Sequence, residues 1–420
     1  MKITHLSTYD LFGGAARAAY RIHQGLLSVG IDSKFLVQRK TSDDPSVISR
    51  ETGLQKLSTK IRLKASWQIL NLQKTTNPIK HSLNLFPSGI HKRINAMDAD
   101  VVHMHWINDE MISIREIARI NKPIVWTLQD MWAFCGADHY EDLEATGRYL
   151  SRYEPSNRPS SYSGLDLDRS TWRRKKKHWA NKQFHMVAPS SWMGNCISKS
   201  ELLKEQPVCV IPNCLDTDCF KPMDKDLAGS RFTLSANKKY VMFGALSGTT
   251  DKRKGFHLLQ SALQQISTHE ISEELEIIVF GSDEPADPPD LGLPTRYLGL
   301  VNDDETLAQL YSAAAVIIAP STQDNLPSSA TEPLACGTPV VAFGTTGLLD
   351  IVDHRQTGYL ATPFDPEDLA QGIIWVLEDD ARRKTLGTNA RNSAVEKYDM
   401  TTVAKQYTDL YEQVLAAKRQ

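Results

Sequence analysis

Short apolar runs without polar alternation recur along this chain, and segments with apolar residues at helical spacing separate them. A run of this kind is typical of a strand that is buried on both faces of a parallel sheet. The predicted strands form a first series at 2–7, 34–37, 101–105, 124–128, 185–188 and 208–211, and a second series at 240–245, 275–281, 315–319 and 340–343. Because strands and helices alternate with short turns, the pattern predicts two Rossmann-like α/β domains with parallel sheets, divided near residue 212.

Length and composition agree with a globular protein of more than one domain. The chain has 420 residues, of which 41% are hydrophobic and 23% are charged, and its formal net charge is −2. That charge gives no general affinity for nucleic acid, and no apolar run reaches the roughly 18 residues of a membrane span. The first residues enter a strand pattern directly rather than a leader peptide. Six cysteines without a Cys-x-x-Cys pair favour reduced thiols, so we expect a cytoplasmic protein.

The stretch from 315 to 343 carries the most specific chemistry. A buried strand ends at Pro320, a polar loop follows, and a helix then runs to a glycine, Gly337, that is suited to its end. Asp324 in the loop and Glu332 in the helix are separated by seven residues, and both follow the carboxyl end of the strand. An open α/β sheet binds its ligands at that edge, and backbone N–H groups at a helix start suit a phosphate.

This stretch resembles the signature of the retaining glycosyltransferases of family 4, in which an acid, seven intervening residues and a Glu contact the donor sugar and ribose. The acid is Asp324 here rather than the usual Glu, but the spacing, Asn-Leu-Pro, Ala-Cys-Gly-Thr-Pro-Val-Val-Ala and the flanking strands agree. The resemblance implies a GT-B fold, with two Rossmann-like domains facing a central cleft. It places an acceptor-binding domain at 1–212, a nucleotide-sugar-binding domain at 213–395, and a helix that crosses back to the first domain at 396–420.

The same resemblance assigns a donor site by position. Lys254 matches a Lys that binds the donor phosphates, whereas Ala245 stands where relatives have an Arg, and the neighbouring Arg253 is the predicted replacement. The Gly13-Gly14 turn after the first strand allows close approach to the diphosphate. The predicted donor-binding residues are Gly13, Gly14, Arg253, Lys254, Leu300, Val301, Asp324, Asn325, Leu326 and Glu332.

Three residues that follow central strands of the first domain are predicted on the acceptor side of the cleft: His105, Gln129 and Asp130. Relatives often carry a His at the position of Gln129, which is neither an acid nor a base but can hydrogen-bond a sugar hydroxyl. His103 and His105 share one strand face at a spacing that suits a metal, but no third ligand is evident. We therefore expect no metal, and we expect His103 to be structural.

Two basic segments and one polar segment have no place in this donor site. The predicted helix at 54–73 carries four Lys or Arg residues and a Trp, and the run at 171–179 holds five consecutive basic residues. Both are compatible with peripheral contact with the inner face of an anionic membrane, although a solvated helix face is the plainer interpretation. The stretch from 141 to 170 lacks an apolar period, so it is predicted to be a long mobile loop, either a lid or acceptor-binding loop or plain disorder.

The reaction implied by the resemblance is transfer of a hexosyl group, with retention and without cofactor or metal, from a UDP- or GDP-sugar to a glycan or lipid-linked glycan in cell-surface polysaccharide synthesis. The residues predicted to carry it are Asp324, Glu332, Lys254 and His105. No protein nucleophile is evident, which favours attack by the acceptor on the face that the diphosphate leaves. Two alternatives stay open: a catalytically inactive nucleotide-sugar-binding scaffold, favoured by Gln129, Ala245 and Asp324, and a nucleotide-sugar epimerase.

Overall fold

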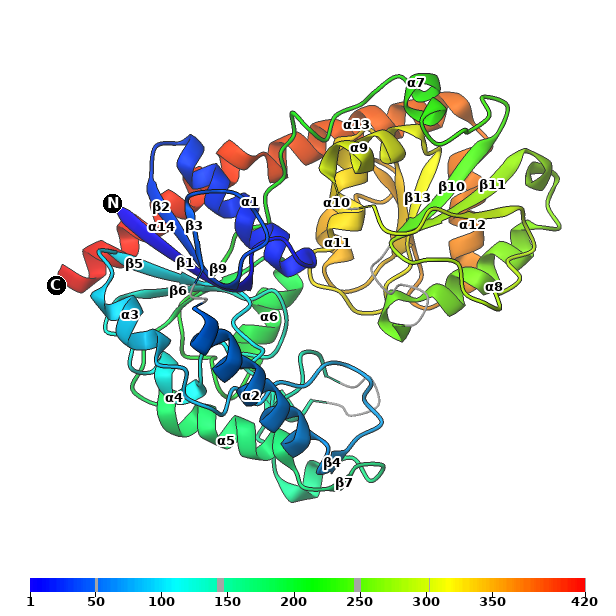
Figure 1. The fold of residues 1–420 in the computed structure, drawn as a ribbon. Coiled ribbons are helices and arrows are strands. Elements are labelled where there is room, and N and C mark those ends of the chain that lie inside the picture. Colours follow the sequence, from blue (N-terminus) through cyan, green and yellow to red (C-terminus); the bar gives the residue numbers. More distant parts are fainter. Residues whose placement is uncertain (50–51, 142–146, 245–250, 302, 420) are drawn as a thin grey trace. The chain divides into compact units, whose positions relative to one another are not determined.

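The computed structural model describes residues 1–49, 52–141, 147–244, 251–301 and 303–419 (Figure 1). The chain divides into two units: unit 1 holds Met1–Asn213 and Val403–Gln420, and unit 2 holds Cys214–Thr402. Each unit is built on a parallel sheet with helices packed on it. No helix within the described ranges is long and apolar enough to cross a membrane.

Unit 1 contains a seven-stranded parallel sheet in the order β3-β2-β1-β5-β6-β8-β9. Its strands are β1 (Lys2–Tyr9), β2 (Asp32–Arg39), β3 (Val47–Ser49), β5 (Val101–Met104), β6 (Ile124–Thr127), β8 (His185–Ala188) and β9 (Val208–Val210). Its helices are α1 (Gly14–Ser28), α2 (Gly53–Leu70), α3 (Ile90–Ala96), α4 (Ile114–Ile117), α5 (Leu167–Trp179) and α6 (Ser191–Lys199), with short 3-10 turns η1 (Arg148–Leu150) and η2 (Pro155–Asn157). A separate antiparallel pair joins β4 (Gln73–Lys74) to β7 (Ser163–Gly164).

Unit 2 contains a six-stranded parallel sheet in the order β12-β11-β10-β13-β14-β15. Its strands are β10 (Lys239–Gly244), β11 (Leu275–Phe280), β12 (Thr295–Tyr297), β13 (Val316–Ala319), β14 (Val340–Phe343) and β15 (Gly358–Ala361). Its helices are α7 (Lys225–Ser230), α8 (Phe256–Ile266), α9 (Asp304–Ala313), α10 (Ser328–Ala335), α11 (Leu348–Ile351), α12 (Pro366–Leu377) and α13 (Asp380–Tyr398), with 3-10 turns η3 (Lys252–Lys254) and η4 (Glu270–Glu274). The last helix, α14 (Met400–Arg419), begins in unit 2 and continues in unit 1.

All ten strands predicted from the apolar runs are present, and the two Rossmann-like domains are confirmed. Central strands are buried throughout because both faces of each sheet are covered, as β5, β6, β13 and β14 show. In both sheets the strand order reverses beside the first strand of the unit, between β1 and β5 and between β10 and β13. Ligands of open α/β sheets bind outside the carboxyl ends of the strands at this point.

The unit boundaries fall at 213/214 and at 402/403, whereas the sequence analysis places them at 212/213 and 395/396. Residues just before α14 stay with unit 2 because the Thr217 hydroxyl donates to Asp399 Oδ2 at 2.7 Å. In unit 1, the Tyr411 hydroxyl lies 2.7 Å from His103 Nδ1, and the Tyr407 hydroxyl lies 3.0 Å from Thr127 Oγ1. Hydrogen bonds of Tyr407 and Tyr411 therefore attach α14 to β5 and β6.

The stretch predicted as a long mobile loop is ordered where the structure describes it, and residues 142–146 lie outside the described part. Residues 147–164 form η1, η2 and β7. The Arg148 guanidinium bonds Asp166 Oδ2 at 2.9 Å, and the Tyr153 ring is buried beneath that guanidinium. The alternative of plain disorder is therefore wrong for these described residues, because buried aromatic and ionic contacts replace the missing apolar period, and a lid or acceptor-binding loop stays a prediction.

Candidate functional site

An ion pair joins the two loops at the point in unit 2 where the strand order reverses. Lys254 ends η3, which follows β10, and Asp324 lies in the loop that follows β13. The Lys254 ammonium lies 2.6 Å from Asp324 Oδ2. The Thr322 amide also donates to the Arg253 carbonyl at 2.7 Å, so backbone and side-chain bonds hold the two loops together.

The Asp324 carboxyl of this pair is kept ionised by its surroundings. Burial raises the pKa of the Asp324 carboxyl, but the Lys254 charge and its hydrogen bond outweigh burial and leave that pKa below its usual value. An ammonium group has three N–H donors, and the bond to Asp324 uses one of them. The side chain of Lys254 is 22% exposed, so its positive end is partly accessible to an anionic group.

The loop that carries Asp324 is held by its own backbone and by the turn after β14. Asp324 Oδ1 accepts from the Asn325 amide at 3.0 Å, the Asp324 amide donates to Thr346 Oγ1 at 3.2 Å, and the Gly347 amide donates to the Asp324 carbonyl at 3.1 Å. A Cβ atom on Gly347 would lie 1.3 Å from the Asn325 carbonyl oxygen, so only glycine fits there. The predicted Asn325 amide is thus bonded within the loop, and the Leu326 side chain beside it is buried.

Glu332 lies one turn into α10 and is 3% exposed. Its Oε2 accepts a hydrogen bond from the Tyr311 hydroxyl at 3.1 Å, which fixes the carboxyl against α9. Burial, and then the nearby Glu332 charge, raise the pKa of the Cys336 thiol, so that thiol is an inert core group. The structure therefore places the two predicted acids at the same edge of the sheet but in different settings, one ion-paired and one hydrogen-bonded.

The remaining predicted donor residues of unit 2 are less closely gathered. Arg253 pairs with Asp251, whose Oδ2 lies 2.7 Å from its Nη2, so its charge is already partly balanced. Leu300 is 55% exposed and Val301 packs partly against the core, both after the edge strand β12. Ala245, which stands where relatives have an Arg, lies outside the described residues.

In unit 1, the glycine turn follows β1 and opens α1. Gly13 has φ of 83°, a conformation that glycine adopts without strain, and its carbonyl accepts from the Arg17 amide at 3.1 Å. No atom lies within 4 Å of a Cβ built on Gly13 or Gly14. Packing therefore does not demand glycine at either position, and the backbone shape demands it only at Gly13.

His105, predicted at the cleft, is instead 2% exposed and belongs to a buried histidine cluster. Its Nε2 lies 2.9 Å from His5 Nδ1, and the register of β1 and β5 pairs His5 with His103. The ring nitrogens of these three residues lie within 4.8 Å of one another, so His5 is the third candidate ligand that the sequence did not reveal. However, both nitrogens of His103 bond hydroxyl groups, which favours a network of neutral rings over a metal centre.

Gln129 and Asp130, which follow β6, are both engaged within unit 1. The Gln129 amide exchanges two hydrogen bonds with the Asn213 amide, at 2.8 and 3.1 Å. Asp130 Oδ2 lies 2.6 Å from His139 Nδ1 and also accepts from the Trp106 indole at 2.8 Å. Burial raises the pKa of Asp130, but His139 and these hydrogen bonds outweigh it, so that pKa lies below its usual value.

Comparison with known proteins agrees with this division of the chain. The model of glycosyl transferases group 1 matches residues 231–393, and the model of Glycosyltransferase Family 4 matches residues 12–219. The chain belongs to the family 4 type of glycosyltransferase. The group 1 match contains the Lys254–Asp324 pair and Glu332, and the family 4 match contains the glycine turn, His103 and His105 but not His5.

Individual relatives show the same family and fold. An uncharacterized glycosyltransferase of Methanocaldococcus jannaschii is 30% identical over 182 residues, which are 42% of this chain and 45% of that protein. The chain spans about half the length of the curated relatives it matches. Sucrose-phosphate synthase from Thermosynechococcus elongatus has a TM-score of 0.68 at 19% identity over 99% of this chain and 100% of that one. Anabaena HepE in complex with UDP-glucose has a TM-score of 0.64 at 18% identity, covering 98% and 100%. These likenesses show a GT-B fold.

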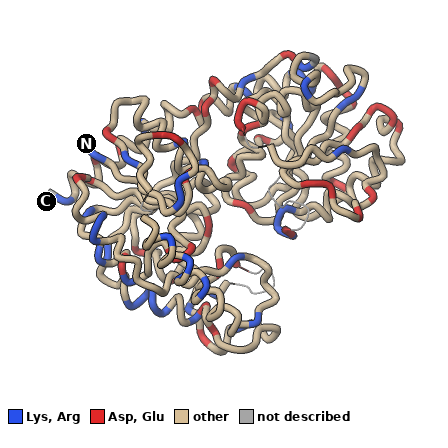
Figure 2. The backbone as a smooth tube through the Cα atoms, viewed as in Figure 1, with Lys and Arg blue, Asp and Glu red and all other residues tan. Residues whose placement is uncertain are grey.

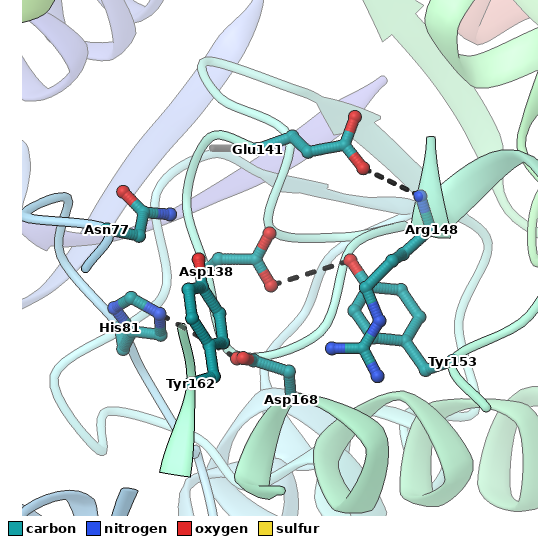
Figure 3. A pocket seen from close by; sticks show the side chains of 8 residues that line it. All are labelled: Asn77, His81, Asp138, Glu141, Arg148, Tyr153, Tyr162 and Asp168. Atoms are coloured by element: carbon teal, nitrogen blue, oxygen red, sulfur yellow. Dashed lines mark hydrogen bonds and ion pairs between the residues drawn. The ribbon is translucent and has the colours of Figure 1, made fainter. Parts of the chain in front are cut away.

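Sequence reasoning missed a buried polar pocket in this glycosyltransferase (Figure 3). Asp138, Glu141 and Asp168 point into it, and burial raises the pKa of Asp138 to about 6 and that of Glu141 to about 7. The Arg148 amide donates to Glu141 Oε1 at 2.7 Å, and His81 Nε2 lies 3.8 Å from Asp168 Oδ1. The free volume of about 10 Å³ has room for a single water, so the pocket anchors the segment around it rather than holding a sugar.

The supporting residues of the donor-side pair were also missed, because no local motif marks them. Tyr311 and Thr346 contact Glu332 and Asp324 from α9 and from the turn after β14. Each is ordinary in its own stretch of sequence. Only a weak signal was available for Thr346: it follows a predicted central strand, at the edge of the sheet where loops from neighbouring strands meet.

Proposed function

We propose that this protein transfers a hexosyl group, with retention of the anomeric configuration, from a UDP- or GDP-sugar to a hydroxyl of a glycan or lipid-linked glycan. Membership of the family supports the reaction class. The observation that carries the proposal further is the Lys254–Asp324 pair at the reversal point of the second sheet. It puts a cation and an anion side by side where such sheets bind nucleotides.

The pair matches the two ends of a nucleotide-sugar. Lys254 would bind the diphosphate with its remaining N–H donors, while Asp324 would accept hydrogen bonds from sugar hydroxyls. Glu332, fixed by Tyr311, would accept from the ribose hydroxyls. HepE, which shares the fold, has been crystallised with UDP-glucose, and this favours a uridine donor for the first assays.

The remaining predicted donor contacts stay part of the proposal as secondary ones. Arg253 and the Gly13-Gly14 turn would add to diphosphate binding, and Leu300 and Val301 would lie beside the base. Asn325 and Leu326 would shape the sugar end of the site, since the Asn325 amide already bonds Asp324.

The proposed chemistry needs no protein nucleophile. The acceptor oxygen forms a bond to the anomeric carbon as the bond from that carbon to the β-phosphate oxygen breaks, and the acceptor proton passes to the departing phosphate. Lys254 stabilises the charge that develops on the diphosphate, which is where a positioned cation lowers the barrier most. His105, Gln129 and Asp130 are the proposed acceptor-side residues of unit 1 and act by positioning, since His105 Nε2, the Gln129 amide and Asp130 Oδ2 each bond another side chain.

The proposal is tested with a thermal-shift panel of UDP-, GDP- and ADP-sugars, followed by product analysis with the donor that stabilises the protein. A donor at about 100 times its Kd adds about 2.7 kcal/mol to the free energy of unfolding. We expect an α-linked product from an α-linked donor, and a β-linked product would refute retention. Donor isomerised without an acceptor would indicate an epimerase, and donor binding without turnover would indicate an inactive scaffold.

Glu332→Gln sharpens this test, because it keeps the shape but removes the charge that would accept two ribose hydroxyls. We expect donor affinity to fall about tenfold to 100-fold, in line with loss of charged hydrogen bonds. Glu305→Gln, an exposed acid on α9, is the matched control and should bind donor normally. Equal affinity in both variants would remove Glu332 from the donor site.

A further inference from the structure

Helix α2 exposes a row of large apolar side chains. Leu54, Leu57 and Ile61 are 82%, 56% and 59% exposed, and their spacing of three and four residues places them on one face. The opposite face packs on unit 1 through the buried Thr59 and Ser66, and the Ser66 hydroxyl donates to Glu110 Oε1 at 2.9 Å. At the end of the helix, Ile69 and Leu70 pack on a small hydrophobic cluster. The apolar row therefore faces away from the core, which is unusual for a surface helix of a globular protein.

A row of lysines runs beside this apolar row. Lys56, Lys60 and Lys64 recur every fourth residue, and all three are exposed. Trp67, on the same side of the helix as the lysines, is 63% exposed. The helix contains no Asp or Glu, although the chain as a whole has a net charge of −2. Positive charge is thus concentrated where the apolar row is exposed.

The neighbouring helix α5 extends the basic surface, and Figure 2 shows Lys and Arg gathered along both helices. The two helices are connected because β4, which follows α2, pairs with β7, which precedes α5. They also share a partner, since Glu110 interacts electrostatically with both Arg62 and Arg174. A groove of about 420 Å³ on α5 is lined by Asp166, Arg169, Ser170, Arg173, Arg174 and Lys177.

We propose that α2 and α5 form a docking surface for an anionic lipid bilayer, with the apolar row of α2 inserted at the level of the headgroups. Exposed leucine and isoleucine beside lysine and tryptophan are what a helix lying in a membrane interface requires. The basic groove on α5 then faces lipid phosphates. A twofold contact between copies of this face would bring the two lysine rows together, so charge favours the bilayer over a second copy.

This surface gives the proposed transferase a location. A lipid-linked acceptor presents its reactive sugar at the membrane surface, so docking would keep the enzyme where the acceptor is concentrated. The docking itself does not depend on the transferase assignment. It is measured without a sugar substrate, and its failure would leave the donor-site proposal untouched.

The test is co-flotation of the full-length protein with lipid vesicles. One set is phosphatidylcholine alone, and in the other about a third of the lipid is anionic phosphatidylglycerol, enough to give a negative surface potential. We expect binding to the anionic vesicles, weak binding to the neutral ones, and release as salt is raised to about 1 M, where the screening length falls to about 3 Å. Equal binding to both sets, or none, would overturn the proposal.

Two variants separate the contributions of charge and apolar contact. Lys56→Gln/Lys60→Gln/Lys64→Gln should weaken binding to anionic vesicles about 100-fold, and Leu57→Ser/Ile61→Ser should weaken it about tenfold. All five side chains are exposed, so the fold should be unaffected.

Matched controls in unit 2 are Lys384→Gln on α13 and Leu227→Ser on α7, where Leu227 is 75% exposed. Both should bind vesicles as the parent does. Loss of binding in the controls as well would show that the effect is not specific to α2. Self-association that disappears in Leu57→Ser/Ile61→Ser, without vesicle binding in the parent, would identify the face as a contact between copies instead.

Discussion

The two sheets of this protein share one strand order around the reversal point, yet the chemistry at that point differs between them. In unit 2 the loops there hold a charged pair, of which Lys254 is partly exposed and Asp324 is buried. In unit 1, His5 lies on β1, His103 lies on β5 and His105 follows β5, and these rings are buried, hydrogen-bonded and lowered in pKa by burial. Unit 2 therefore has a charged pair in the loops at the edge of its sheet, whereas unit 1 has uncharged rings packed together along its strands.

The difference shows that strand topology determines where a site can lie and that the side chains there determine its chemistry. Burial lowers the pKa of His105 to about 3, so the ring is neutral at neutral pH and offers no charge to a ligand. The opposite holds for Asp324, whose pKa is pulled down by a neighbouring cation that keeps the carboxylate ionised. This contrast is compatible with an anionic donor at unit 2 and a neutral hydroxyl acceptor at unit 1.

The largest expected effect comes from removing the cation. Lys254→Ala should lower turnover about 100- to 1,000-fold, because charge on the departing diphosphate then lacks its positioned partner. Initial rates with saturating donor and acceptor measure this. Lys252→Ala, an exposed neighbour in the same 3-10 turn, is the matched control and should turn over at the parent rate.

Lys254→Ala also leaves Asp324 buried without its partner, which destabilises the fold by itself. The double variant Lys254→Ala/Asp324→Asn separates the two effects, because the neutral amide needs no cation. We expect it to melt near the parent temperature and still to turn over slowly. If turnover returned together with stability, the lysine would be structural.

An intermediate effect is expected on the free energy of unfolding when the pH is lowered, because unit 1 contains a buried histidine. Burial lowers the pKa of His23 from 6.5 to about 4, while its two nitrogens bond Ser33 and Ser46 hydroxyls at 2.7 and 2.8 Å. Between those pH values the unfolded chain binds a proton at this ring and the folded chain does not. The free energy of unfolding should therefore fall as pH drops below about 6.5, by up to about 1.4 kcal/mol per pH unit for each such histidine.

Chemical denaturation at pH 7.5 and 5.5 measures this slope. In His23→Gln the amide keeps hydrogen bonding to the serines but does not titrate, so the loss between the two pH values should shrink by roughly 1 kcal/mol. Binding of nucleotide-sugar by unit 2 should change little over the same range, because the Lys254 charge holds the pKa of Asp324 below its usual value. An unchanged slope in the variant would mean that His23 binds protons equally in the folded and unfolded chains, which would contradict a lowered pKa in the folded protein.

The smallest effect is expected at Gln129. Gln129→Ala removes the reciprocal bonds to Asn213 and should lower the free energy of unfolding by about 1 kcal/mol, as partly buried hydrogen bonds do. If the residue only positions the chain, KM for the acceptor should stay within about threefold of the parent. A large rise in acceptor KM at unchanged stability would instead place the amide on the sugar.

Much of the fold was predictable because parallel strands that are buried on both faces have continuous apolar sequences. β12 (Thr295–Tyr297) was missed because it is a short edge strand with half-buried polar residues. α13 (Asp380–Tyr398) was missed because its buried face consists largely of small residues such as Gly387, Ala390 and Ala394, which give little apolar period. A Cβ on Gly387 would lie 2.3 Å from the Gly337 carbonyl, so small size is what this packing needs.

The candidate site was predictable only where one stretch of sequence contains it. Asp324 and Glu332 were found after a predicted strand, at the spacing of the family signature that this stretch resembles, and Lys254 was found through the same resemblance. His5 was not found as a neighbour of His105, since their contact arises from the register of two strands far apart in the chain. The burial of His105 was not predictable either, because the sequence at the end of a strand is the same whether the last side chain faces solvent or packs on another histidine.

The contact between Gly347 and the Asn325 carbonyl tells an enzyme engineer where to search for altered sugar preference. A second tight approach, between Gly255 and the Pro320 carbonyl, leaves 1.8 Å for a Cβ atom. A mutant library should hold these two glycines constant, because any larger residue displaces the loop that carries Asp324. Diversity belongs at Ser321, whose hydroxyl donates to Asp324 Oδ2 at 3.4 Å, whereas Thr346 should be kept because its hydroxyl accepts from the Asp324 main-chain amide.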